Sequence, residues 1–74
     1  MQITVKLFAS FRSGRFAREV QELPEGTTVA AVAADLGIRE EELGVMAVNG
    51  RHVRADHVLA DGDTCSIFPV VGGG

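Results

Sequence analysis

The C-terminal residues carry the group most open to chemistry. The chain ends in an apolar run followed by three glycines: Phe68-Pro69-Val70-Val71-Gly72-Gly73-Gly74. Glycine backbone can pass where any Cβ would clash, so such a tail can thread a narrow channel in another protein. The pattern therefore predicts that the tail presents the carboxylate of Gly74 to a partner's active site. The alternative is an ordinary frayed chain end.

Other reactive side chains are better explained by structure than by catalysis. Cys65 is the only cysteine, and its parity in a predicted strand places it in the core, where a thiol is inaccessible. His52 and His57 lie five residues apart without a third ligand, so we expect surface residues and no metal site. Asp61 and Asp63 flank a glycine, as in an Asx turn.

Length and charge restrict the class of protein. Seventy-four residues make one small domain, and a single cysteine excludes an intramolecular disulfide. The net charge of −3, with scattered Lys and Arg, argues against nucleic acid as the main partner. The opening residues lack a signal-peptide pattern and no run reaches membrane-spanning length, so we expect a cytoplasmic protein without a membrane partner.

The first half of the chain predicts a hairpin and a helix. Apolar Ile3, Val5 and Leu7 alternate with Thr4, Lys6 and Phe8, the period of a half-buried strand. A turn is expected over 10–14, a second strand over about 15–22, and a stop at 23–26. A helix should begin at Thr27 or Thr28 and end at Gly37, because the spacing of Val29, Val32, Ala33 and Leu36 forms one buried stripe.

The second half predicts more strands. One further helical turn is expected over 39–43, with a solvated glutamate run, then a short strand over 45–48. Asn49-Gly50 is a strong hairpin signal before a return strand over 51–53. An irregular segment over 55–60 and a turn over 61–63 precede a last strand over 64–69. The order predicts an α+β roll, with a mixed sheet of four to five strands packed on one main helix.

Strand parity places two aromatic residues outside the core. If the helix covers Ile3, Val5 and Leu7, then Phe8 and Phe68 are left on the outer face of the sheet. Two aromatic side chains on a solvent face predict an apolar docking patch. The alternative is that a loop covers one of them, or that both are isolated surface residues.

The whole pattern resembles the MoaD/ThiS family of ubiquitin-like sulfur carriers. The resemblance is carried by the order of elements, by Val48-Asn49-Gly50, by Asp61-Gly62-Asp63 and by the C-terminal run. The opening Val5-Lys6-Leu7-Phe8-Ala9, followed by Arg12, resembles the molybdopterin synthase small subunit, whose ending follows Phe-Pro-Pro-Val-x-Gly-Gly. Here Val70 replaces the second proline. The resemblance implies a β-grasp domain over 1–69 and a flexible glycine-rich tail over 70–74.

The resemblance also implies a chemistry in which the chain is a carrier and not an enzyme. An adenylyltransferase resembling the ubiquitin-activating enzymes would use ATP and magnesium to activate Gly74, and a persulfide donor would supply sulfur. The chain itself would bind no cofactor. Gly73 would permit threading, while Phe8, Phe68 and His52 would dock a synthase large subunit together with Val70, Val71 and Gly72. His52 departs from the apolar residues that relatives tend to have there.

Several functions remain open from the sequence, among them a carrier for cysteine or another sulfur metabolite. The leading interpretation is sulfur donation in molybdopterin synthesis, for the molybdenum or tungsten cofactor. A carrier for thiazole synthase in thiamine synthesis is the nearest alternative. A ubiquitin-like modifier conjugated through Gly74 begins with the same adenylate and differs in the attacking nucleophile. A plain interaction domain of the same fold would leave Gly74 unmodified.

Overall fold

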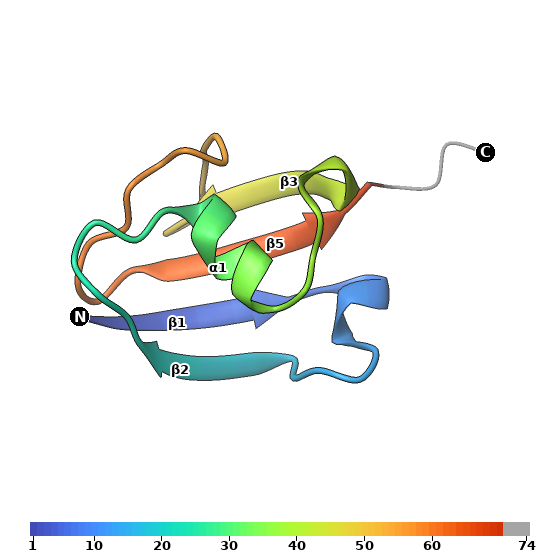
Figure 1. Ribbon diagram of the computed structural model, residues 1–74, viewed down its shortest axis with the longest axis horizontal. Coiled ribbons are helices and arrows are strands. Elements are labelled where there is room, and N and C mark those ends of the chain that lie inside the picture. The colour runs from blue at the N-terminus through green and yellow to red at the C-terminus, as the bar shows by residue number, and fades with distance from the viewer. Residues whose placement is uncertain (71–74) are drawn as a thin grey trace.

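A five-stranded mixed sheet lies against one α-helix in the computed structural model, which describes residues 1–70 (Figure 1). The strands are β1 (Gln2–Leu7), β2 (Arg18–Glu22), β3 (Leu43–Val48), β4 (Arg51–His52) and β5 (Thr64–Pro69). Their order across the sheet is β2-β1-β5-β3-β4, with β1 and β5 parallel and the other pairs antiparallel. The predicted α+β roll, with its mixed sheet and single main helix, is confirmed.

The central strands owe their place to alternating apolar side chains. Ile3, Val5 and Leu7 of β1 are fully buried, as are Cys65 and Ile67 of β5. The parallel register pairs Val5 with Cys65 and Leu7 with Ile67, so all five side chains lie on one face. Burial of this face stabilises the fold, since apolar area removed from water is worth roughly 25 cal/mol per Å².

The helix α1 (Val29–Asp35) covers that face. The Oγ1 atom of Thr28 accepts a hydrogen bond from the backbone N–H of Ala31 at 3.2 Å and caps the helix. Val29, Val32 and Ala33 are buried against the sheet, as the periodicity predicts. Gly37, with φ of +77°, follows the C-cap and ends the helix.

The connection between β1 and β2 differs from the predicted turn. Residues Ala9–Arg12 form a 3-10 helix, η1, which buries Phe11 in the core. The strand β2 begins at Arg18 and not at about Arg15, because its partner β1 ends at Leu7, one residue after Lys6, which pairs with Arg18. The side chain of Arg15 makes a separate contact. Its Nε donates to the carbonyl oxygen of Leu36 at 2.9 Å, beyond the end of α1.

The second half follows the prediction closely. The predicted turn after α1 is a 3-10 helix, η2 (Glu40–Glu42), and β3 begins directly after it at Leu43. Asn49 and Gly50 have φ of +52° and +83°, as a type I′ hairpin requires. The return strand is one residue shorter than predicted, and β5 has the predicted bounds.

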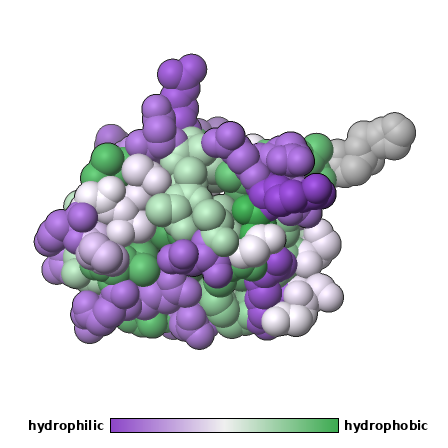
Figure 2. Space-filling view, viewed as in Figure 1, coloured by the Kyte–Doolittle hydropathy of each residue, from purple (hydrophilic) through white to green (hydrophobic). Residues whose placement is uncertain are grey.

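The helical side of the molecule mixes polar and apolar surface. Figure 2 shows apolar residues of the α1 side interspersed with polar side chains over the whole visible face. Within residues 1–70, no helix is both long enough and apolar enough to cross a bilayer.

Candidate functional site

The sheet face opposite α1 carries two stacked aromatic rings. The ring centroids of Phe8 and Phe68 lie 4.0 Å apart, and the ring planes differ by 9°. Both residues are half-buried. Parity explains their position, because each follows a buried residue, Leu7 in β1 and Ile67 in β5, and those two residues are register partners. A near-parallel stack at this separation gains mainly from the apolar ring area that the two residues remove from water.

A cation extends the aromatic stack. The guanidinium carbon of Arg12 lies 5.3 Å from the centroid of the Phe8 ring. The Nε of Arg12 donates a hydrogen bond to the carbonyl oxygen of Leu7 at 2.7 Å, which fixes the side chain beside the ring. Arg12 is exposed, so this end of the sheet presents one positive charge next to an apolar surface.

A hollow of about 320 Å³ adjoins the aromatic stack. The antiparallel registers pair Ala47 with both His52 and Ser66, which places Ala47 and His52 on the same face as Phe68. We call the stack and hollow together the outer patch; its residues are Phe8, Val45, Ala47, Gly50, His52, Phe68 and Pro69. The patch is mostly apolar, concave and large enough to receive side chains of a partner protein.

The backbone leaves the sheet beside the outer patch. Val70 directly follows β5, its side chain is exposed, and its backbone N–H donates to the carbonyl oxygen of Glu42 at 3.1 Å. The structure therefore places Phe8, His52, Phe68 and Val70 at or next to one surface. Val71, Gly72, Gly73 and Gly74 lie outside the described residues, and the roles predicted for them stay predictions.

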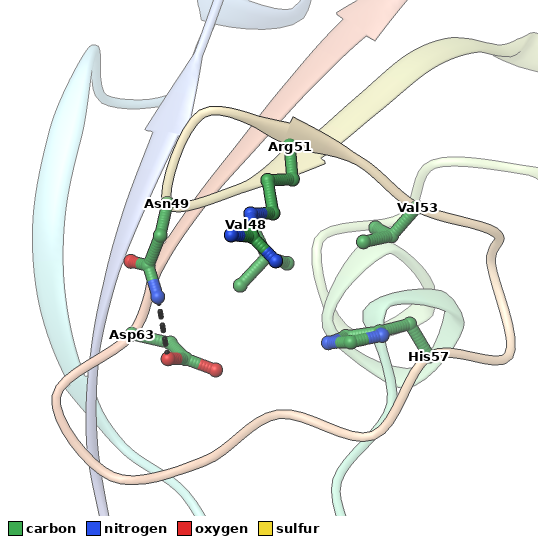
Figure 3. Close-up of a pocket in the computed structure, with 6 residues that line it drawn as sticks. All are labelled: Val48, Asn49, Arg51, Val53, His57 and Asp63. Atoms are coloured by element: carbon green, nitrogen blue, oxygen red, sulfur yellow. Dashed lines mark hydrogen bonds between the residues drawn. The ribbon is translucent and has the colours of Figure 1, made fainter.

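The turn before β5 has a structural explanation. Asn49 Nδ2 donates to one carboxylate oxygen of Asp63 at 2.8 Å, and the backbone N–H of Ala60 donates to the other at 2.8 Å. Thr64 N–H donates to Asn49 Oδ1 at 2.9 Å. The hydrogen-bonded pair Asn49 and Asp63 lies beside a second hollow of about 450 Å³, which His57 and Arg51 also line (Figure 3). Among residues 1–70, no three His, Cys, Asp or Glu side chains gather to hold a metal.

Cys65 lies in the core, as predicted. Its residue surface is fully buried, and burial, with a smaller contribution from the charge of Asp63, raises the pKa of the thiol to about 11. A thiol with this pKa is almost entirely protonated at neutral pH and cannot serve as a nucleophile or sulfur-bearing group.

The sequence matches a known family along almost its whole length. The ThiS family matches residues 5–74. The chain belongs to the ThiS family. This confirms the resemblance to MoaD/ThiS proteins drawn from the sequence. No curated protein sequence matches the chain.

Solved structures agree with this family and fold. A protein from Pyrococcus furiosus assigned as molybdopterin converting factor, subunit 1, is 34% identical, with a TM-score of 0.74 over 96% of this chain and 99% of that one. SAMP1 from Haloferax volcanii, a small archaeal modifier protein, is 22% identical, with a TM-score of 0.73 and full coverage of both chains. A complex of molybdopterin-converting factor subunits 1 and 2 from Helicobacter pylori contains a chain 21% identical, with a TM-score of 0.64 and full coverage of both.

Sequence reasoning missed residues of the outer patch and of the structure around it. Val45 and Ala47 line the hollow, and their alternation with buried Val48 could have assigned them to the outer face. The burial of Phe11 could not be foreseen, because it depends on η1 and not on strand periodicity. Gly44 reads as an ordinary residue at the edge of an apolar run, and only the folded chain shows what lies against it.

Proposed function

We propose that this chain is a sulfur carrier whose Gly74 carboxylate is adenylated and then converted to a thiocarboxylate. The observation that carries the proposal is the family match over residues 5–74, which includes the C-terminal glycines. The chain is then a carrier and co-substrate, and the catalytic groups belong to its partner enzymes.

The proposed chemistry overcomes the poor reactivity of a carboxylate. A carboxylate oxygen of Gly74 attacks the α-phosphorus of ATP, and magnesium pyrophosphate leaves. The sulfur of a persulfide donor then attacks the acyl carbon and displaces AMP. Cleavage of the sulfur–sulfur bond by a thiol leaves the thiocarboxylate. No side chain of residues 1–70 is needed for these steps, which agrees with the buried, protonated thiol of Cys65.

The outer patch is the proposed docking surface for a synthase large subunit. It is apolar, and the chain leaves β5 next to it, so a partner seated there would receive residues 70–74 at its active site. Holding donor and acceptor in one complex replaces a bimolecular encounter with an intramolecular step. The complex of two subunits known for the Helicobacter pylori protein supports this kind of partner.

Molybdopterin synthesis is the pathway we favour. The support is the 34% identity to the Pyrococcus furiosus protein, together with the Phe8-Ala9 opening and the Phe68-Pro69 ending. Thiazole synthesis for thiamine is the alternative within the family. Conjugation to lysines of other proteins is the alternative outside it, and the likeness to SAMP1 is compatible with that role through fold alone.

Reconstitution tests the proposal. The chain, the adenylyltransferase of the same organism, ATP, magnesium and a persulfide donor are incubated, and pyrophosphate release and protein mass are measured. We expect pyrophosphate release that requires this chain, followed by exchange of one oxygen for sulfur at Gly74. Adding each synthase large subunit with its acceptor then identifies the pathway. Absence of chain-dependent pyrophosphate release would contradict the proposal.

A further inference from the structure

Gly44 lies against the backbone at the point where the chain leaves the sheet. The β3–β5 register pairs Leu43 with Pro69 and then shifts before Met46, so Gly44 sits inside an irregularity of the ladder. A Cβ atom added at Gly44 would clash with the carbonyl oxygen of Pro69 and would lie 2.6 Å from its carbonyl carbon and 2.8 Å from the nitrogen of Val70. All three atoms belong to backbone, which cannot rotate away as a side chain can.

Space, and not conformation, requires glycine at this position. The φ angle of Gly44 lies outside the positive region that favours glycine, unlike those of Gly26, Gly37 and Gly50. Gly44 is exposed, so the absence of a side chain there does not serve to make room for a residue of the core. In a strand, glycine weakens pairing and typically marks a close approach by other backbone. Here the approaching backbone is that of Pro69 and Val70.

A second contact fixes the same point. The N–H of Val70 donates to the carbonyl oxygen of Glu42, the last residue of η2. Glu42 is itself held, because its carboxylate accepts from the backbone N–H of Arg39 at 2.8 Å. This hydrogen bond is the main cause that lowers the pKa of Glu42. Residues 42–44 therefore contact the backbone of residues 69–70 from one side and restrict its position.

We propose that Gly44 is a positioning residue that sets the direction in which the chain leaves β5 toward the active site of a partner enzyme. The inference rests on the proposed function, since direction matters only if the chain end reacts. A methyl group at residue 44 would push Pro69 and Val70 aside and break the hydrogen bond to Glu42. Pro69 also belongs to the outer patch, so binding of the partner and positioning of the chain end are measured separately, as KM and kcat.

The test compares Gly44→Ala with Gly26→Ala. Gly26 has φ of +88° and open space around it, so its replacement introduces backbone strain without displacing the exit of β5. Pyrophosphate release by the adenylyltransferase of the same organism is measured as a function of carrier concentration. For Gly44→Ala, we expect kcat to fall roughly ten- to a hundredfold, as for other small misplacements of reacting groups, and KM to change less than kcat. Gly26→Ala should keep the wild-type kcat.

Hydrogen exchange at the Val70 amide provides a readout that needs no enzyme. In Gly44→Ala this amide should exchange faster, while the amides of β1 keep their protection. If Gly44→Ala does not fold, a synthetic chain with an ester in place of the Pro69–Val70 amide lacks the Val70 N–H, and with it the hydrogen bond to Glu42, without a new side chain at residue 44, and it should also show a loss of kcat. An unchanged kcat in the folded variants, with wild-type chain active, would overturn the inference. No pyrophosphate release with the wild-type chain would contradict the proposed function. In that case, an unchanged rate of hydrogen exchange at the Val70 amide of Gly44→Ala would still overturn the inference about Gly44.

Discussion

The two faces of β5 differ in burial, because alternate residues of the strand point to opposite sides of the sheet. Cys65 and Ile67 point inward and are fully buried under α1, whereas Phe68 points outward, is half-buried and stacks on Phe8. A buried aliphatic side chain mainly stabilises the fold. A partly exposed ring beside a hollow adds little to the fold and offers a surface to a partner. Changes to the two faces should therefore separate stability from function.

Deleting Gly74 should have the largest functional effect, because it removes the proposed reacting residue and no residue of the sheet. We expect chain-dependent pyrophosphate release and sulfur transfer to be abolished, with the thermal unfolding midpoint unchanged. Both are measured on the same preparation, by an enzyme-coupled assay and by circular dichroism. A clear fall in the unfolding midpoint would show that the chain end contributes to the folded domain.

The inner face should dominate stability. Ile67→Ala removes a fully buried side chain from the face of β5 that α1 covers and should lower the free energy of unfolding by about 2–5 kcal/mol. Denaturant titration measures this value. The folded fraction should still bind its synthase subunit with wild-type affinity, since the outer patch is untouched. A loss below about 1 kcal/mol would contradict the assignment of Ile67 to a tightly packed core.

The outer face should dominate binding. Phe68→Asp places a charge in the apolar patch and should weaken binding of the synthase large subunit by at least roughly tenfold. It should lower the free energy of unfolding less than Ile67→Ala does, because Phe68 is only half-buried. Val20→Asp is the matched control, because Val20 is also exposed on this face but lies in the edge strand β2. Binding is measured by calorimetry, and equal affinity of the two variants for the synthase large subunit would contradict the assignment of the outer patch as its docking surface.

The smallest effect should come from the titration of Cys65. Burial raises the pKa of this thiol in the folded chain from 9.0 to about 11, so between these values the unfolded chain has lost a proton that the folded chain keeps. The thiol therefore stabilises the fold below pH 9, and this contribution is lost as the pH rises toward 11. Denaturant titrations at several pH values should show that decline, and Cys65→Ala should make it shallower. An identical decline in the variant would assign it to other groups.

Local sequence patterns predicted most of the fold, because the interactions that determine it are local or periodic. The helix stripe, the cap at Thr28, the Asn49-Gly50 hairpin and the bounds of β5 all follow from spacing and turn chemistry. The start of β2 was predicted too early, because β1 ends at Leu7 and η1 follows it, so the residues before Arg18 have no strand register partners in β1. The alternation in the sequence does not indicate where η1 replaces the strand.

The site was only partly predictable for the same reason. Parity placed Phe8 and Phe68 on the outer face, but the hollow beside them depends on how β3 and β4 pair with β5. The close approach of Gly44 to Pro69 joins residues 25 positions apart, so no pattern in the sequence near either residue indicates it. Side chains that face the core have a periodic signature, while contacts between distant backbone segments do not.

The most direct test of the central claim is the mass of the protein isolated from its native host, with alkylation at lysis to trap any thiocarboxylate. Fragmentation of the C-terminal peptide then locates the modification. Sulfur in place of one oxygen at Gly74 is the predicted result. Gly74 joined through isopeptide bonds to lysines of other proteins, with no trapped thiocarboxylate, would contradict the carrier function and establish a protein modifier instead.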